Sequence, residues 1–238
     1  MHILLTDILT CPRCGPAFGL ILLADQVVDR RVLEGRLGCA NCREQYPVHE
    51  GIARFGGTAG KPVADGPGTP GTDTGAGANT GSGSTAARSP EDPDTAMRLA
   101  GLMGVTEGPG HMVLLGDAAA HATAVADMIP GVQVVAAGSD LAAWPPLPAE
   151  YASGDGGVSR VEVSGRLPFA SGRLLGIAVT GSCADAWLEE AARMVAPARR
   201  LVLDPAPADA EARLVPSGLQ VVAHEGSTLV AARTGAPA

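Results

Sequence analysis

Short hydrophobic runs alternate with Ala-rich amphipathic stretches over residues 94–238. Apolar runs of strand length predict strands at residues 111–115, 132–136, 158–163, 174–180 and 200–203. Apolar residues at helical spacing predict helices at residues 94–104, 119–129 and 185–195. This alternation is typical of a mainly parallel α/β sheet with helices on both faces.

Two further apolar runs close the chain, at residues 219–223 and 228–232, separated by four turn-type residues. This spacing predicts a hairpin, which would bring one antiparallel strand into the otherwise parallel sheet. Residues 141–157 show no periodic pattern and are expected to form a loop. The predicted fold class is therefore α/β, with a Rossmann-like sheet that ends in an antiparallel hairpin.

Residues 56–93 interrupt the pattern with a run of Gly, Pro, Ser and Thr that contains almost no large apolar side chain. Burial there cannot offset the conformational entropy lost on ordering, so we expect a disordered, flexible linker. The predicted organisation is a small unit at residues 1–55, the linker at residues 56–93, and the α/β domain at residues 94–238.

The net charge of −8 arises outside the first unit, because six Arg and six acidic residues balance one another within residues 1–55. With no basic segment, direct binding of nucleic acid is not expected. No apolar stretch is long enough for a transmembrane helix, and the N-terminus lacks a signal-peptide pattern. We therefore expect a cytoplasmic protein without membrane association.

Four of the five cysteines form two CxxC pairs, Cys11 with Cys14 and Cys39 with Cys42. Each pair can hold two sulfurs about 3.7 Å apart, as tetrahedral Zn²⁺ requires. Gly15 can adopt a positive φ that turns the chain under the metal. Two disulfides, a redox CxxC or an iron–sulfur centre are the alternatives. Structural zinc is preferred, since four cysteines leave no position open for water.

The residues that flank the cysteines carry a specific resemblance. Asp7-Ile8-Leu9 precedes the first pair, and Tyr46-Pro47-Val48 followed by Gly51-Ile52 comes after the second. This pattern resembles the Trm-type zinc-ribbon family, which includes the small activator subunit of eukaryotic tRNA, ribosomal and release-factor methyltransferases. The resemblance covers nearly all of residues 1–55. It departs at Ala53-Arg54, where the family usually has Pro and further apolar residues.

The resemblance implies a zinc ribbon that binds and stabilises a methyltransferase domain, in its own chain or in a separate one. A ribbon of this size contains more large apolar side chains near its end than core filling explains. Core filling accounts for about half of a set of five, and the rest are expected to form a protein-binding patch. The five residues are Tyr46, Pro47, Val48, Ile52 and Phe55.

Residues 93–235 resemble class I S-adenosylmethionine-dependent methyltransferases in the order and length of their elements. The best local match is Leu167-Pro168-Phe169-Ala170-Ser171-Gly172, followed by the strand predicted at residues 174–180. The family has a Gly-x-Gly-x-Gly turn after its first strand, where backbone approaches the cofactor. Here Gly116 is followed by Ala118 and Ala120 at the other glycine positions, and Leu114 replaces the family's acid.

Two further positions depart from the methyltransferase pattern. Ala136-Ala137-Gly138 stands where an acid usually holds the ribose, with Asp140 arriving late, and Gly181-Ser182-Cys183 stands where many members have a catalytic motif. A methyl group at a glycine position can clash with a close ligand, and a lost bidentate acid costs a few kcal/mol, on the order of the usual penalty for an unmade charged hydrogen bond. Weak or absent cofactor binding is therefore expected, with no catalytic and no cofactor-binding residue assigned.

The remaining candidates are expected to be structural. His111 opens a predicted strand, His121 lies in the first turn or helix, His49 lies near an already closed metal site, and Cys183 ends a strand. The leading functional hypothesis is a zinc-binding activator or scaffold that carries its own non-catalytic methyltransferase-like domain. The alternative is an active S-adenosylmethionine-dependent methyltransferase with an atypical cofactor turn.

Overall fold

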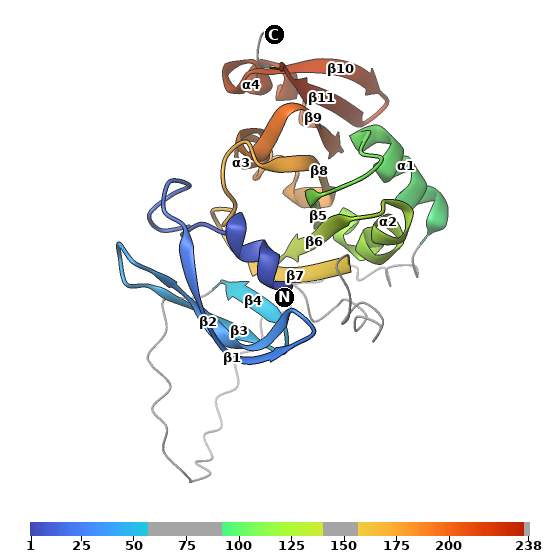
Figure 1. Cartoon of the computed structure of the whole chain (residues 1–238). Coiled ribbons are helices and arrows are strands. Elements are labelled where there is room, and N and C mark those ends of the chain that lie inside the picture. The colour runs from blue at the N-terminus through green and yellow to red at the C-terminus, as the bar shows by residue number, and fades with distance from the viewer. Residues whose placement is uncertain (57–91, 140–156, 236–238) are drawn as a thin grey trace, which may run out of the picture.

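A computed structural model describes residues 1–56, 92–139 and 157–235, and its strands form one sheet in the order β1-β2-β3-β4-β7-β6-β5-β8-β9-β11-β10 (Figure 1). The predicted linker, apart from its ends, and the predicted loop at residues 141–157, apart from Gly157, lie outside the described residues, as does Asp140. The described structure is a mixed α/β fold, as the sequence predicts.

The N-terminal part of the sheet is antiparallel and comes from the cysteine-rich unit. A 3-10 helix, η1 (Ile3–Asp7), is followed by β1 (Leu20–Val28), β2 (Arg31–Cys39), β3 (Gln45–His49) and β4 (Ile52–Phe55). The two CxxC turns, which we call the first and second knuckles, lie before β1 and at the end of β2. This segment is zinc-ribbon-like, in agreement with the sequence.

The other seven strands form a Rossmann-like, methyltransferase-type sheet. Their bounds are β5 (Gly110–Gly116), β6 (Val132–Gly138), β7 (Gly157–Val163), β8 (Leu174–Thr180), β9 (Val195–Asp204), β10 (Leu219–Glu225) and β11 (Thr228–Arg233). Strands β7, β6, β5, β8 and β9 are parallel, whereas β11 runs antiparallel to both β9 and β10. The predicted closing hairpin is thereby confirmed.

Helices cover both faces of this sheet. Helices α1 (Pro93–Met103) and α2 (Ala122–Met128) pack on one face, and α3 (Leu188–Met194) and α4 (Ala210–Leu214) on the other, with 3-10 turns η2 (Asp117–His121), η5 (Gly181–Cys183) and η6 (Val215–Ser217) between strands and helices. Asp92 caps the start of α1 through its side chain, and Gly104 ends it in a left-handed conformation.

Some predicted boundaries were wrong. The helix expected at residues 119–129 opens as the 3-10 turn η2, and the helix expected at residues 185–195 begins at Leu188. Val195 already belongs to β9, which pairs with β8 on both sides of a bulge. The sequence did not predict this early start, because Pro197 is unusual inside a strand. The next residue, Ala198, has a positive φ. The short helix α4 was not predicted.

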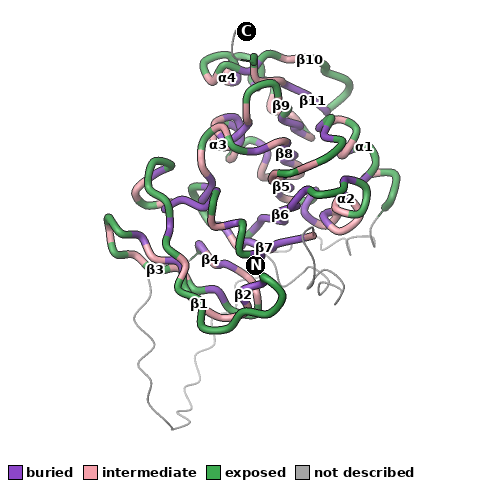
Figure 2. Tube along the Cα trace, viewed as in Figure 1, coloured by how far each residue is buried: buried purple, intermediate pink, exposed green. Residues whose placement is uncertain are grey.

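The ribbon and the α/β domain are joined by a set of contacts that we call the junction, made between residues 1–56 and residues 157–170. Strand β4 pairs in parallel with β7, so the two sheets are continuous. Leu9 also forms an isolated antiparallel bridge with Phe169. One hydrophobic cluster runs from Met1 in the ribbon to Ala231 in β11. In Figure 2 the central strands β5, β6, β7 and β8 are largely purple, whereas the two end strands, β1 and β10, are mostly green.

Within the three described ranges, no helix combines the length and the apolar character that a membrane span requires.

Candidate functional site

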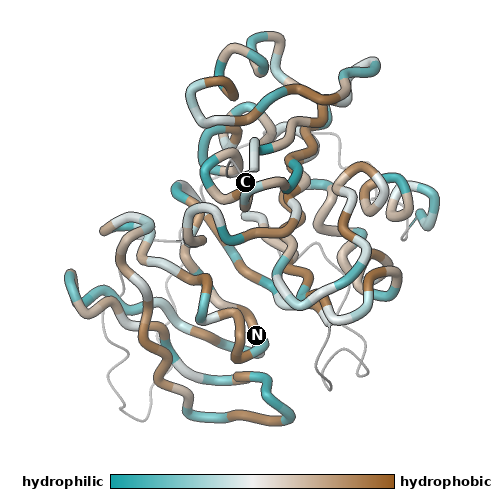
Figure 3. Tube along the Cα trace, turned by 45° about the horizontal axis from the view of Figure 1, so that its top comes forward, coloured by the Kyte–Doolittle hydropathy of each residue, from teal (hydrophilic) through white to brown (hydrophobic). Residues whose placement is uncertain are grey.

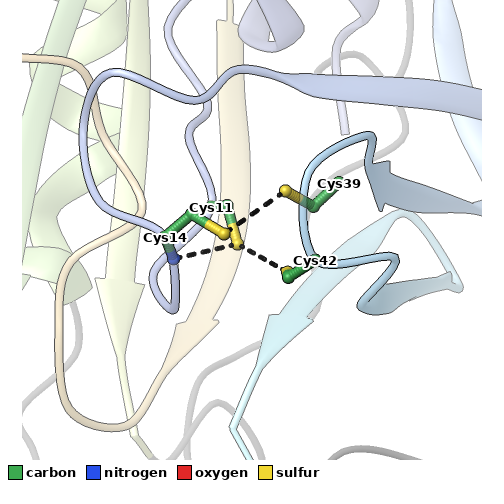
Figure 4. A group of neighbouring side chains, drawn as sticks. All are labelled: Cys11, Cys14, Cys39 and Cys42. Carbon is green, nitrogen blue, oxygen red and sulfur yellow. Dashed lines mark hydrogen bonds between the residues drawn. The ribbon is translucent and has the colours of Figure 1, made fainter.

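The structure brings the four predicted metal ligands together. The Sγ atoms of Cys11, Cys14, Cys39 and Cys42 all lie within 4.8 Å of one another (Figure 4). The Cys11–Cys42 and Cys14–Cys39 separations are 3.7 Å and 3.8 Å. Bonds of about 2.3 Å in a tetrahedron require sulfurs about 3.8 Å apart, so this geometry fits zinc.

Hydrogen-bond donors surround the sulfurs of the cluster. The amide of Cys14 donates to Cys11 Sγ at 3.4 Å, and Asn41 Nδ2 donates to Cys14 Sγ at 3.2 Å. Burial acts to raise the pKa of Cys39, but amide donors from Cys42 and Asn41 outweigh it and lower that pKa to about 7. Amide donors at knuckle sulfurs stabilise the charged form that a metal binds.

Tyr46 contributes a contact that sequence reasoning missed. Its hydroxyl lies 3.3 Å from Cys11 Sγ, and its ring packs against Phe55 with centroids 4.9 Å apart. Burial, followed by the hydrogen bond with Cys11, raises the Tyr46 pKa, so the phenol keeps its proton and can donate to the sulfur. Among the five apolar residues that the sequence divides between core and binding patch, Tyr46 links the metal cluster to β4.

The other four of these apolar residues are divided between the core and the surface. Val48 and Phe55 are buried in the cluster shared with the α/β domain, Ile52 packs against the cluster on the opposite face, and Pro47 is exposed. The departure at Ala53-Arg54 falls inside the junction. Ala53 is fully buried opposite Val161, and Arg54 is ion-paired with Glu162.

The turn after β5, where the resemblance places the cofactor, packs tightly against the turn after β8. Gly116 has φ 68°, and a Cβ added to it would lie closer than 3.0 Å to both Thr180 O and Cys183 Sγ. A Cβ on Gly181 would likewise lie closer than 3.0 Å to the Asp117 carboxylate. The amide of Ala118 donates to Thr180 Oγ1 at 2.5 Å. The space into which a side chain at Gly116 or Gly181 would extend is therefore filled by the chain itself.

Two cavities border the same edge of the sheet. One, of about 530 Å³, is lined by residues that follow β6, β7 and β8, among them Ser139, Ser164, Cys183 and Trp187. The other, of about 600 Å³, lies between the turns after β8 and β9 beside Arg213, which is ion-paired with Asp185, Glu189 and Asp209.

The other sequence candidates lie apart from the metal cluster. His49 Nδ1 lies 2.9 Å from Glu34 Oε2 on the ribbon. His111 is at the start of β5, where burial lowers its pKa, and His121 ends η2. The Cys183 Sγ contacts Thr180 O at 3.2 Å.

Comparison with protein families found a match for the N-terminal unit. A family model described as Trm112p-like protein matches residues 2–51. A comparison with curated proteins found no match.

Comparison with solved structures places the fold. The [4+2]-cyclase SpnF is similar at 11% identity and a TM-score of 0.50, over 60% of this chain and 81% of that one. A complex of the Haloferax volcanii Trm112 methyltransferase activator with a proposed methyltransferase is similar at 13% identity and a TM-score of 0.45, over 60% and 89%. A precorrin-6y C5,15-methyltransferase from Geobacter metallireducens has 14% identity and a TM-score of 0.44, over 60% and 88%.

At these identities the likeness to SpnF shows the fold alone, and the two lower scores carry no argument. The protein thus has a Trm112p-like N-terminus followed by a methyltransferase-like α/β domain. Four cysteines in the first part are close enough to bind one metal ion.

Proposed function

We propose that this protein is a zinc-dependent scaffold, in which the Trm112p-like ribbon binds and stabilises the methyltransferase-like domain of its own chain. The observation that carries the proposal is the pairing of Ile52–Phe55 in β4 with residues 160–163 in β7. Bound zinc would supply structural cross-linking of the two knuckles and no chemistry of its own. A reducing compartment such as the cytoplasm would keep the four thiols available.

The β4–β7 contact supplies both backbone and side-chain interactions. Besides the ladder, Arg54 is ion-paired with Glu162 on the neighbouring strand. Arg31, which is almost fully buried, donates to Val158 O at 2.7 Å. The amide of His2 donates to Ser159 Oγ at 3.0 Å. Buried hydrogen bonds of this kind fix the register of the two units, because shifting either one would leave polar groups unpaired.

A second contact joins the segment before the first knuckle to the loop between β7 and β8. Thr10 N donates to Pro168 O at 2.9 Å, and Ala170 N donates to Ile8 O at 2.8 Å. Phe169, with no exposed surface, packs in the shared core. Arg193 in α3 donates to Phe169 O at 2.7 Å and so ties this loop to the sheet's helical layer. The ribbon therefore holds the α/β domain at two separated points.

This arrangement argues against a separate methyltransferase at the same place. A strand edge accepts one neighbour, and the β4 edge is already paired with β7. A partner enzyme would have to displace the α/β domain of the same chain. Covalent linkage gives that domain a high effective concentration at β4 and so favours it over a separate partner.

We further propose that the α/β domain does not work as an S-adenosylmethionine-dependent methyltransferase. Support comes from the turn after β5, where Gly116 packs against Thr180 and Cys183 and where Ala118 and Ala120 replace two glycines of the family pattern. The buried methyl groups of Ala118 and Ala119 add bulk to the same turn.

The test is isothermal titration of the zinc-loaded full chain with S-adenosylmethionine, after metal analysis of the same sample. We expect one zinc per chain and no measurable heat of cofactor binding. Micromolar binding would contradict the non-catalytic assignment but leave the scaffold role standing. A folded chain that holds no metal would instead contradict the scaffold role.

An active methyltransferase is the second candidate, favoured by the cavity of about 530 Å³ after β6, β7 and β8. Saturable cofactor binding that is weakened by Trp187→Ala would favour it, since Trp187 lines that cavity. A Val222→Ala variant on the opposite end of the sheet serves as the matched control. Co-purification of a methyltransferase with the tagged chain would point to an adaptor that acts on a separate enzyme.

A further inference from the structure

Among the residues that the structure describes, exposed large apolar side chains are concentrated in the first part of the ribbon. Met97, Met128, Val215 and Val222 are spread over the α/β domain, whereas the remaining exposed members of this class lie within residues 3–28: Ile3, Leu4, Phe18, Ile21, Leu23, Val27 and Val28. Monomeric proteins seldom gather such side chains in one small region without a partner. Most of them belong to β1, whose hydrophobic character can be followed in Figure 3.

The β1 strand forms one end of the sheet. On the inner face, Leu20 is buried and Leu22 is partly buried, opposite the fully buried Leu37 on β2. The alternate residues Ile21 and Leu23 point to the other face and are 57% and 45% exposed. On the edge away from β2, the described residues contribute one isolated bridge, from Thr10 to Gly19, which leaves the strand open beyond it.

The two end strands of the sheet differ in the apolar surface that they expose. Each has an uncharged run without Pro, residues 20–24 in β1 and 219–223 in β10, and each has a register shift near the end of that run. Strand β1 exposes four large apolar side chains, whereas β10 exposes Val222. The more apolar end of the described sheet is therefore the ribbon end.

Charge also favours association at the ribbon rather than elsewhere. Residues 1–55 have six basic and six acidic side chains, whereas the whole chain has a net charge of −8. Two copies that meet through their α/β domains would repel, and two that meet through β1 would not. Strand addition is moreover the way in which the ribbon already contacts β7, so a further strand on β1 would continue the same sheet.

We propose that β1 is a self-association surface, where it pairs with β1 of a second copy of this chain in antiparallel orientation about a twofold axis. A twofold contact is isologous, so the same patch serves both copies. With the axis near Leu23, the Leu23 side chains of the two copies face one another, and Ile21 flanks them on the same face. The product is a continuous sheet through both molecules, with the α/β domains at its far ends.

The test uses the zinc-loaded full chain in sedimentation velocity over a range of micromolar concentrations. The wild-type chain is expected to shift from the mass of one 23.9 kDa chain to that of two as concentration rises. Leu23→Lys and Leu23→Asp chains are each expected to stay monomeric, because like charges would face one another across the axis. An equimolar mixture of the two variants is expected to dimerise again, since opposite charges then meet.

Val222→Lys, at an exposed position of the opposite end strand, is the matched control and should dimerise like the wild type. Zinc content and circular dichroism of each variant establish that loss of the dimer is not loss of the fold. A wild-type chain that stays monomeric at all concentrations overturns the proposal. This holds whether β1 is then open to solvent or covered by another segment of the same chain. A mixture that fails to dimerise overturns the twofold arrangement.

Discussion

The first knuckle and the turn after β5 are both short turns built around a glycine with positive φ, and they differ in what surrounds that glycine. At Gly15 the nearest atom to an added Cβ would be Arg166 Nη1 at 3.5 Å, an ordinary contact. At Gly116 an added Cβ would meet Thr180 and Cys183 closer than 3.0 Å. The four sulfurs beside the first turn surround a metal-sized space, whereas the second turn is packed against its own chain.

The comparison shows that a ligand-binding turn depends on the segment placed opposite it. The second knuckle brings two more sulfur ligands to the first knuckle, at the spacing that a tetrahedral metal site requires. The turn after β8 brings a side chain and a carbonyl to Gly116, which fill the space instead. The first knuckle is thus arranged for a ligand, whereas the turn at Gly116 is arranged for packing.

The largest expected effect comes from removing the metal. Cys39→Ser should abolish zinc binding and with it an apparent contribution of about 10 kcal/mol or more. Because the ribbon and the α/β domain share one hydrophobic cluster, the melting temperature of the whole protein should fall sharply. Metal analysis and calorimetry of purified protein check this. Cys183→Ser, outside the cluster, should keep one zinc per chain; equal zinc content in both variants would contradict the assignment.

The junction supplies the next largest effect. Phe169→Ala should reduce the free energy of unfolding by about 3–5 kcal/mol, because it leaves a cavity beneath the bridge to Leu9. Phe18→Ala removes the same group from a 41% exposed position of the ribbon and should change stability by less than about 0.5 kcal/mol. Urea unfolding measures both. Equal losses would mean that the junction is not a packed interface.

The close packing of the turn after β5 can be tested by adding a methyl group at Gly116. Gly116→Ala should destabilise the protein by about 1–3 kcal/mol, because it adds a clash to an unfavourable φ. Gly101→Ala in α1, which meets nothing within 4 Å, should be neutral or stabilise the helix by about 0.5–1 kcal/mol. A Gly116→Ala variant as stable as the wild type would show that the turns after β5 and β8 are not in contact.

The ion pair across the junction should matter less than the packing. Arg54 and Glu162 are each partly exposed, so a double-mutant cycle with Arg54→Ala and Glu162→Ala should give a coupling energy below about 1 kcal/mol. The coupling should shrink further in high salt. A much larger value would move the main stabilisation of the junction from its apolar core to this pair.

The smallest expected effect is a pH dependence on the exposed face of the ribbon. The Glu34 carboxylate raises the pKa of His49, while the Glu50 amide, followed by His49, lowers the pKa of Glu34. The contribution of His49 is full below its usual pKa of 6.5 and is lost as pH rises through the raised value. That of Glu34 is full above its usual 4.5 and is lost as pH falls.

The difference in melting temperature between the wild type and His49→Gln should therefore be greatest at pH 5–6, between the usual values of the two groups. Thermal scans in buffers on both sides of this window measure it. A difference that is the same at alkaline pH would show that the pair contributes nothing through its charge.

The sequence alone determined the features that depend on neighbours along the chain. The CxxC spacings predicted four ligands that the structure brings within 4.8 Å. The end of α1 at Gly104 and the whole of β8 followed from local periodicity and a stop signal. Such features are fixed by dihedral preferences and side-chain alternation, which a short window of sequence contains.

Only the tertiary structure decided how distant segments meet. The partner of β4 is β7, which lies about a hundred positions further along the chain. Neither strand's own sequence specifies which distant strand it pairs with or in which register. Gly116 by itself fitted an open turn, and Cys183 by itself fitted a strand end. Their contact fills the turn because packing depends on which side chains the completed fold places opposite one another, and that is set by the whole sheet.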